Sequence, residues 1–143
     1  MLTVNYVAIL LAAISTMIVG SVWYSPKTPM GKNWMNWNKF NPKDADKMTA
    51  KDMILPIGGT FITSLLLAYM IAHVSNMSNQ VLGGSQLQSG LTTGFFMWLG
   101  ITVAAIFSHQ IFEGKPLKLI SLNLSHDLVK LMIIGLIIGL MGW

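Results

Sequence analysis

Residues 116–143 read P-L-K-L-I-S-L-N-L-S-H-D-L-V-K-L-M-I-I-G-L-I-I-G-L-M-G-W, and the last 13 of them, after Lys130, carry no charged side chain. A helix needs about 20 residues to cross the apolar part of a bilayer, so 13 are too few. A span here must therefore begin near residue 119 and enclose four polar side chains: Asn123, His126, Asp127 and Lys130. Ionisable groups inside a membrane helix are costly and mark functional sites by default.

The composition of the whole chain agrees with a membrane protein. Of its 143 residues, 53% are hydrophobic and only 10% are charged, against about 25% charged in a typical soluble domain. The chain has no cysteine, which excludes disulfides, a thiolate nucleophile and any cysteine-based metal site. The net charge of +4 comes from lysines beside apolar stretches, which indicates membrane topology rather than nucleic-acid binding.

Four apolar stretches of membrane length predict an all-α integral membrane bundle, with helices at about 3–24, 53–74, 90–112 and 119–142. We expect one domain over residues 1–143, with a retained first span rather than a cleaved signal peptide. The loops 25–52 and 113–118 are predicted to be cytoplasmic. The uncharged stretch 75–89, which is rich in Ser, Asn, Gln and Gly, is predicted to be the second connection, between the second and third spans.

The lysines predict the orientation. Eight of the nine flank the first and third connections: Lys27, Lys32, Lys39, Lys43, Lys47, Lys51, Lys115 and Lys118. Because positive residues favour the cytoplasmic side, both termini are expected outside the cytoplasm, in the inner membrane of a bacterial cell. Topology explains every lysine except Lys130.

The first cytoplasmic loop also contains Met30, Trp34, Trp37 and Phe40 at helical spacing. That pattern predicts a short amphipathic helix in the head-group region, where its lysines meet anionic lipids. Trp23 and Tyr24, at the end of the first span, are expected at the same interface. The expected partner is thus the lipid bilayer.

Small residues recur on three of the predicted spans. They are Ala12, Thr16 and Gly20 on the first, Gly90 and Gly94 on the third, and Gly135 and Gly139 on the fourth. Such faces permit close approach of helices. The partner helix belongs either to the same chain or to a second copy, so a homo-oligomer remains open.

Six short blocks follow one another along the chain: N-Y-V-A at 5–8, G-S-V-W-Y-S-P at 20–26, G-K-N-W at 31–34, W-L-G at 98–100, F-E-G-K-P-L-K-L at 112–119 and N-L-S-H at 123–126. In these blocks the chain resembles a family of small bacterial four-helix membrane proteins of unknown function. The matching motif positions are Asn5, Trp23, Tyr24, Ser25, Pro26, Trp34, Glu113, Pro116, Asn123 and His126. The resemblance implies four membrane spans and supplies no activity.

A helical wheel of the fourth span separates its polar residues from its glycines. Asn123, Asp127 and Lys130 fall within about 60° of one another, and His126 lies beside them. Gly135 and Gly139 lie about 120° or more away. On the third span, His109 and Glu113 share one face. Since the third and fourth spans form a hairpin, we expect these six polar residues to line one cleft between them.

Three interpretations of this cluster remain open. On the first interpretation, the cluster is a path or binding site for a small solute or ion whose transport is coupled to protons. Intramembrane ionisable groups mark such paths, and histidine titrates near neutral pH. Alternatively, Asp127 and Lys130 neutralise each other and the cluster only stabilises helix packing. Less favoured is an enzyme or metal site formed by His109, Glu113 and His126. Transport is the preferred specific function; no cofactor and no bound metal are predicted, and no catalytic residue is assigned.

Overall fold

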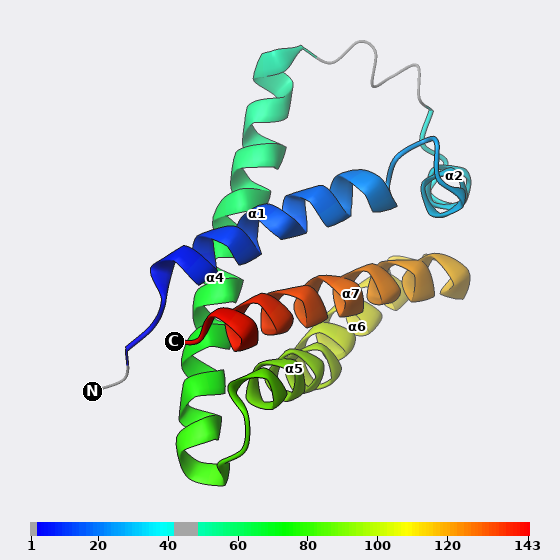
Figure 1. Cartoon of the computed structure of the whole chain (residues 1–143). Helices are drawn as coiled ribbons and strands as arrows, with labels where there is room; N and C mark the ends of the chain where they lie inside the picture. The colour runs from blue at the N-terminus through cyan, green and yellow to red at the C-terminus, as the bar shows by residue number, and fades with distance from the viewer. Residues whose placement is uncertain (1–2, 42–48) are drawn as a thin grey trace.

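The computed structural model describes residues 3–41 and 49–143, and every regular element in these two ranges is helical. The elements, shown in Figure 1, are α1 (Tyr6–Trp23), α2 (Pro29–Trp37), α4 (Ala50–Leu82), α5 (Gln86–Met97), the π-helical segment η1 (Trp98–Val103), α6 (Ala104–Phe112) and α7 (Leu117–Met141). Within the described residues, four helices are long and apolar enough to cross a membrane. The all-α, four-span prediction is confirmed, and α2 is the short helix expected between the first two spans. Lys43 and Lys47 lie outside the described residues.

Local sequence signals fix the ends of α1 and α2. The Asn5 side chain caps α1 by accepting hydrogen bonds from the N–H groups of Val7 and Ala8, both at 3.1 Å. The chain leaves helical geometry at Tyr24, just before Ser25-Pro26. Thr28 then caps α2, and Pro29 occupies its first helical position.

The second span is longer than the predicted helix 53–74. It runs over 33 residues to Leu82, about 50 Å at 1.5 Å per residue, and the connection to α5 shrinks to residues 83–85. The connection predicted for 75–89 is therefore wrong over most of its length. The polar residues there bond to neighbouring parts of the fold: Asn76 donates to the carbonyl of Thr3 at 2.8 Å, and Asn79 donates to Ser89 Oγ at 3.1 Å. These bonds satisfy the side chains without breaking the helix.

Glycines bring α5 and α7 into backbone contact. A β-carbon on Gly94 would lie 2.6 Å from the carbonyl oxygen of Leu131, and one on Gly139 would lie 2.7 Å from the Cα of Leu87. Gly90 and Gly135 face each other still more closely. Both G-x-x-x-G pairs of the sequence are therefore used within this chain, one against the other.

The core lies where α7 meets α1 and α4. Its fully buried side chains include Ala12 from α1, Ala68 and Ile71 from α4, and Leu131 and Ile134 from α7. In Figure 1, α1 and α7 lie side by side and α4 crosses both of them steeply. α7 thus packs against α5 with its glycines and against α1 and α4 with its aliphatic side chains.

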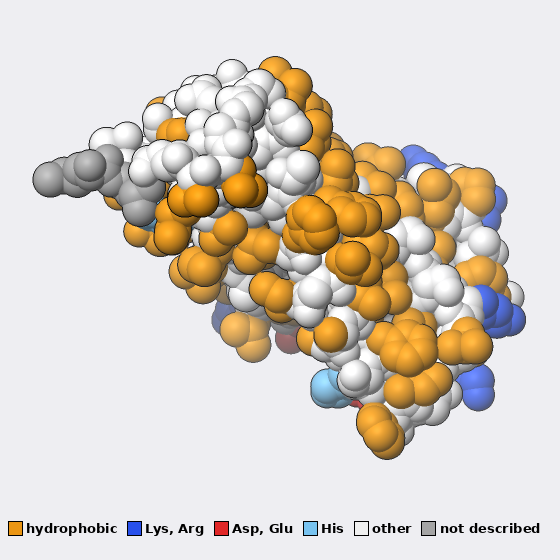
Figure 2. Space-filling model, turned by 90° about the horizontal axis from the view of Figure 1, so that it is seen from below, with side chains coloured by type: hydrophobic (Ala, Val, Ile, Leu, Met, Phe, Trp, Pro, Cys, Tyr) orange, Lys and Arg blue, Asp and Glu red, His pale blue; other side chains and the backbone are white. Residues whose placement is uncertain are grey.

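The outer surface matches an apolar solvent. Large aliphatic and aromatic side chains such as Leu55, Val81 and Phe112 are more than 80% exposed, and Figure 2 shows hydrophobic side chains over most of the visible face. Lysine side chains gather at the end of the molecule where α2 and the α6–α7 connection lie (Figure 2). Because contiguous apolar surface of this extent is unfavourable in water, these faces suit contact with lipid.

The third span changes its helical pitch halfway along. α5 passes without a break into η1 and then into α6, so residues 86–112 form one continuous span. Trp98 begins η1, and its indole nitrogen donates to the carbonyl oxygen of Leu124 in α7 at 2.9 Å. Short π-helical segments often occur near functional sites, and this one faces the polar turn of α7.

Candidate functional site

Three ionisable side chains form a bonded row on α7. Lys130 donates from Nζ to Oδ1 of Asp127 at 3.0 Å, and the same oxygen lies 3.2 Å from Nδ1 of His126. The exposed fractions of the His126, Asp127 and Lys130 side chains are 11%, 13% and 25%. We refer to these three residues as the α7 triad. Its position within a span is tolerable because the charges are paired.

The end of α1 covers the triad with two aromatic rings. The ring centroids of Tyr24 and His126 are 4.8 Å apart, and those of Trp23 and His126 are 5.8 Å apart. Tyr24 also packs edge-on against Trp34 of α2 at 5.3 Å. The predicted interface aromatics Trp23, Tyr24 and Trp34 thus form one layer over His126.

Asn123 links this layer to the third span. The Tyr24 hydroxyl donates to Oδ1 of Asn123 at 3.4 Å, and the amide nitrogen of Asn123 donates to Oε1 of Gln110 at 3.1 Å. Burial, and then the negative charge of Asp127, raises the pKa of the Tyr24 phenol above its usual value. The hydroxyl therefore stays protonated and serves as a donor.

The triad borders a cavity of about 560 Å³ between α1, α4 and α7. His126 and Lys130 of α7 line it, and so do Thr16 of α1 and Ser64 of α4, whose hydroxyls are 2.9 Å apart. The cleft predicted between the third and fourth spans is therefore in the wrong place. The glycine contact packs the second half of α7 against α5. Within the polar stripe, His126 and Lys130 face the cavity beside α1 and α4, whereas Asn123 bonds to Gln110 of α6.

One atom of this wall lacks a partner. Nε2 of His126 is buried and makes no hydrogen bond to any residue in the described part of the chain. It faces Gly20 of α1, where an added β-carbon would lie 3.7 Å away. A buried nitrogen without a partner costs about 1–3 kcal/mol. A solute or water in the cavity would remove that cost.

His109 and Glu113 lie apart from the triad. They pair with each other at 3.0 Å on α6, and their side chains are 75% and 46% exposed. They line shallow hollows on α6 in which His126 takes no part. Among the described residues, no group of three or more His, Cys, Asp or Glu side chains is placed to hold a metal ion. The structure thus separates the three residues proposed for an enzyme or metal site.

The remaining predicted aromatic, Trp37, lies at the end of α2. The ammonium of Lys118 sits over its ring, 5.0 Å from the centroid, and Lys115 donates to Asn38 Oδ1 at 3.2 Å. These contacts hold α2 against the start of α7. They bring the first and third connections to the same end of the bundle.

Sequence reasoning missed three residues of the site. Thr16 stood out only as a small residue that permits close packing, and neither Ser64 nor Gln110 was among the candidate residues. A signal was present for Thr16 and Ser64, because a hydroxyl on a small-residue face also offers a hydrogen bond to the facing helix. No such signal was present for Gln110, because whether it meets Asn123 depends on how the third and fourth spans pack.

Four apolar spans and a paired ionisable cluster between them define a multi-pass helical membrane protein. The chain belongs to a family described as protein of unknown function (DUF1761), which matches residues 7–139. No curated protein and no solved structure matches the chain significantly.

Proposed function

We propose that the protein transports a small anionic solute together with a proton, and that the cavity between α1, α4 and α7 is the binding site. The observation that carries this proposal is the unpaired Nε2 of His126 in the wall of that cavity. The proposed setting is the inner membrane, with α2 and the α6–α7 connection on the cytoplasmic side.

The charges around the cavity favour an anion. Within the part of the chain that the structure describes, Lys130 is the only charged residue that lines it, and Asp127 is not a lining residue. The hydroxyls of Thr16 and Ser64 add groups that bond to an anion or to a neutral acceptor. A cation would meet no carboxylate among the described residues that line the cavity.

His126 supplies a place for the proton. Beside the Asp127 carboxylate, the neutral imidazole is expected to carry its hydrogen on Nδ1, which leaves the lone pair of Nε2 free on the side of Gly20, next to the cavity. A proton taken up at Nε2 gives an imidazolium that stays paired with Asp127. Its positive charge balances the anion, so loading the site adds no net charge to the membrane interior.

A structural role is the second candidate. Asp127 already pairs with both Lys130 and His126, so the triad is internally neutralised without any solute. On this alternative, the cluster only joins α7 to α1 and α6. This alternative predicts that removing the charges of Asp127 and Lys130 together leaves every function of the protein unchanged.

Transport is tested in liposomes that contain a pH-sensitive dye. Inward gradients of chloride, nitrate or inorganic phosphate are imposed, and acidification of the interior is recorded. We expect at least one gradient to acidify vesicles with the wild-type protein. The His126→Gln variant should lose that signal at least tenfold, since its amide cannot take up a proton at neutral pH.

His109→Gln is the matched control, because His109 is exposed on α6 and outside the cavity. It should transport as the wild type does. The proposal is overturned if no gradient acidifies wild-type vesicles, or if correctly folded His126→Gln protein keeps the full signal.

A further inference from the structure

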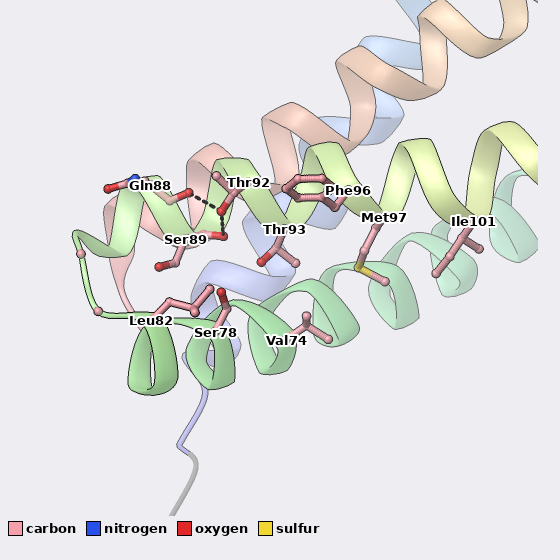
Figure 3. A pocket seen from close by; sticks show the side chains of 12 residues that line it. Val74, Ser78, Leu82, Gln88, Ser89, Thr92, Thr93, Phe96, Met97 and Ile101 are labelled. Atoms are coloured by element: carbon pink, nitrogen blue, oxygen red, sulfur yellow. Dashed lines mark hydrogen bonds between the residues drawn. The ribbon is translucent and has the colours of Figure 1, made fainter.

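A second cavity lies between α4 and α5, at the end of the bundle opposite α2. It has a volume of about 530 Å³ and shares no residue with the cavity at the triad. We call it the α4–α5 groove. Figure 3 shows the side chains that line it: Val74, Ser78, Leu82, Gln88, Ser89, Thr92, Thr93, Phe96, Met97 and Ile101, together with Gly83 and Gly84 of the connection.

The lining of the groove changes in polarity along its length. Ser78, Gln88 and Ser89 lie near the connection between the two helices, whereas Phe96, Met97 and Ile101 lie further along α5 and η1 (Figure 3). None of the described residues that line the groove carries a charge. Since the connection joins two spans, the polar end is near the membrane boundary and the apolar end is deeper in the bilayer.

Two hydroxyls in the groove have no partner. Thr93 is only 6% exposed, and neither its hydroxyl nor that of Ser78 makes a hydrogen bond within the described residues. The neighbouring Thr92 hydroxyl, by contrast, donates to the carbonyl of Gln88 at 2.8 Å. In Figure 3, the side chains of Thr93 and Ser78 both point into the space between α4 and α5.

A hydroxyl in a membrane helix ordinarily bonds to a carbonyl of its own helix, as those of Thr92, Ser121 and Ser125 do here. Leaving one unpaired in apolar surroundings is unfavourable, so Thr93 and Ser78 are suited to bond to a ligand. The ligand must present oxygen atoms at the polar end and an apolar chain beyond them.

We infer that the α4–α5 groove binds an uncharged single-chain lipid of the monoacylglycerol class. The ester and hydroxyl oxygens would bond to Thr93 and Ser78, and the acyl chain would lie along Phe96, Met97 and Ile101. A phosphate or ammonium head group would enter a site without a counter-charge, which disfavours charged lipids. The volume of the groove is within the usual range for pockets that hold one small ligand, about 300–1,000 Å³.

The test uses the full chain in phosphatidylcholine nanodiscs and a monoacylglycerol that carries a diazirine on its acyl chain. After irradiation, we expect labelled peptides to come from α5 and η1, around Phe96–Ile101, and from α4 around Val74. The Thr93→Val, Ser78→Ala double variant should label roughly tenfold less, since it removes both hydrogen bonds but keeps the shape of the groove.

Two control variants separate the effect of the groove hydroxyls on labelling from the effect of side-chain packing. Thr93→Ser keeps the hydroxyl and should label as the wild type does, and Thr92→Val removes a hydroxyl already bonded within α5 and should change nothing. If the double variant does not fold, Ser78→Ala alone should lower labelling roughly threefold.

Competition identifies the head group. Unlabelled monoacylglycerol should displace the probe, whereas lysophosphatidylcholine and lysophosphatidylglycerol with the same chain should compete at least tenfold less well. The inference is overturned if the variants that lack the hydroxyls label as the wild type does, if label is spread evenly over the lipid-facing helices, or if the charged lipids compete equally.

Discussion

Lys130 and Asp127 face each other one turn apart on α7, with the ammonium nitrogen 3.0 Å from a carboxylate oxygen. Among the lysines that the structure describes, Lys130 alone lies away from the ends of the spans. Each charge in this pair makes the other tolerable inside the membrane, because either one alone would lack a counter-charge in a medium of low dielectric.

The pair therefore predicts a specific pattern of stabilities. Asp127→Asn alone should lower the free energy of unfolding by about 3 kcal/mol, since it leaves the Lys130 ammonium unpaired. Adding Lys130→Met should restore most of the loss. The measurement is unfolding of purified protein by SDS titration in detergent. A double variant that is no more stable than Asp127→Asn alone would show that the two charges do not compensate each other.

The glycine contact between α5 and α7 gives a second prediction. Gly90→Ala places a methyl group against the backbone of Gly135, so the helices must separate, and we expect a loss of about 1–3 kcal/mol. Gly59→Ala is the matched control, because a β-carbon there meets no atom within 4 Å. The control should be neutral or stabilise the protein by up to about 1 kcal/mol through helix propensity. Equal effects at both positions in the same unfolding assay would contradict the packing.

The glycine contact also explains what the sequence could and could not predict about the site. The helical wheel correctly separated the polar residues of α7 from Gly135 and Gly139. Which helix packs against each face of α7 could not be predicted, because it depends on how the helices pack together. The short connection suggested that the polar face meets the third span. Asn123 does bond to Gln110 there, but His126 and Lys130 line the cavity between α1, α4 and α7.

The four spans were predictable because their length and hydropathy follow from the thickness of the bilayer. The end of α4 was not, because its polar residues resemble a loop in composition. Asn76 and Asn79 are helical because their amides bond to Thr3 and Ser89, residues whose proximity only the fold creates. Likewise, nothing local indicated that Trp23 and Tyr24 would cover His126 across 100 residues of sequence.

The last prediction concerns orientation. The contacts of Lys115 with Asn38 and of Lys118 with Trp37 bring two lysine-bearing segments to one end of the bundle, and the 83–85 connection lies at the other end. The positive-inside tendency places the lysine-rich end in the cytoplasm. The chain contains no cysteine, so single cysteines can be introduced at Asn36 in α2 and at Ser85 without background labelling. With a membrane-impermeant maleimide, Ser85→Cys should react in right-side-out vesicles and Asn36→Cys only in inverted ones. The cysteine-free parent should not react in either preparation, and the opposite pattern of labelling would reverse the proposed topology.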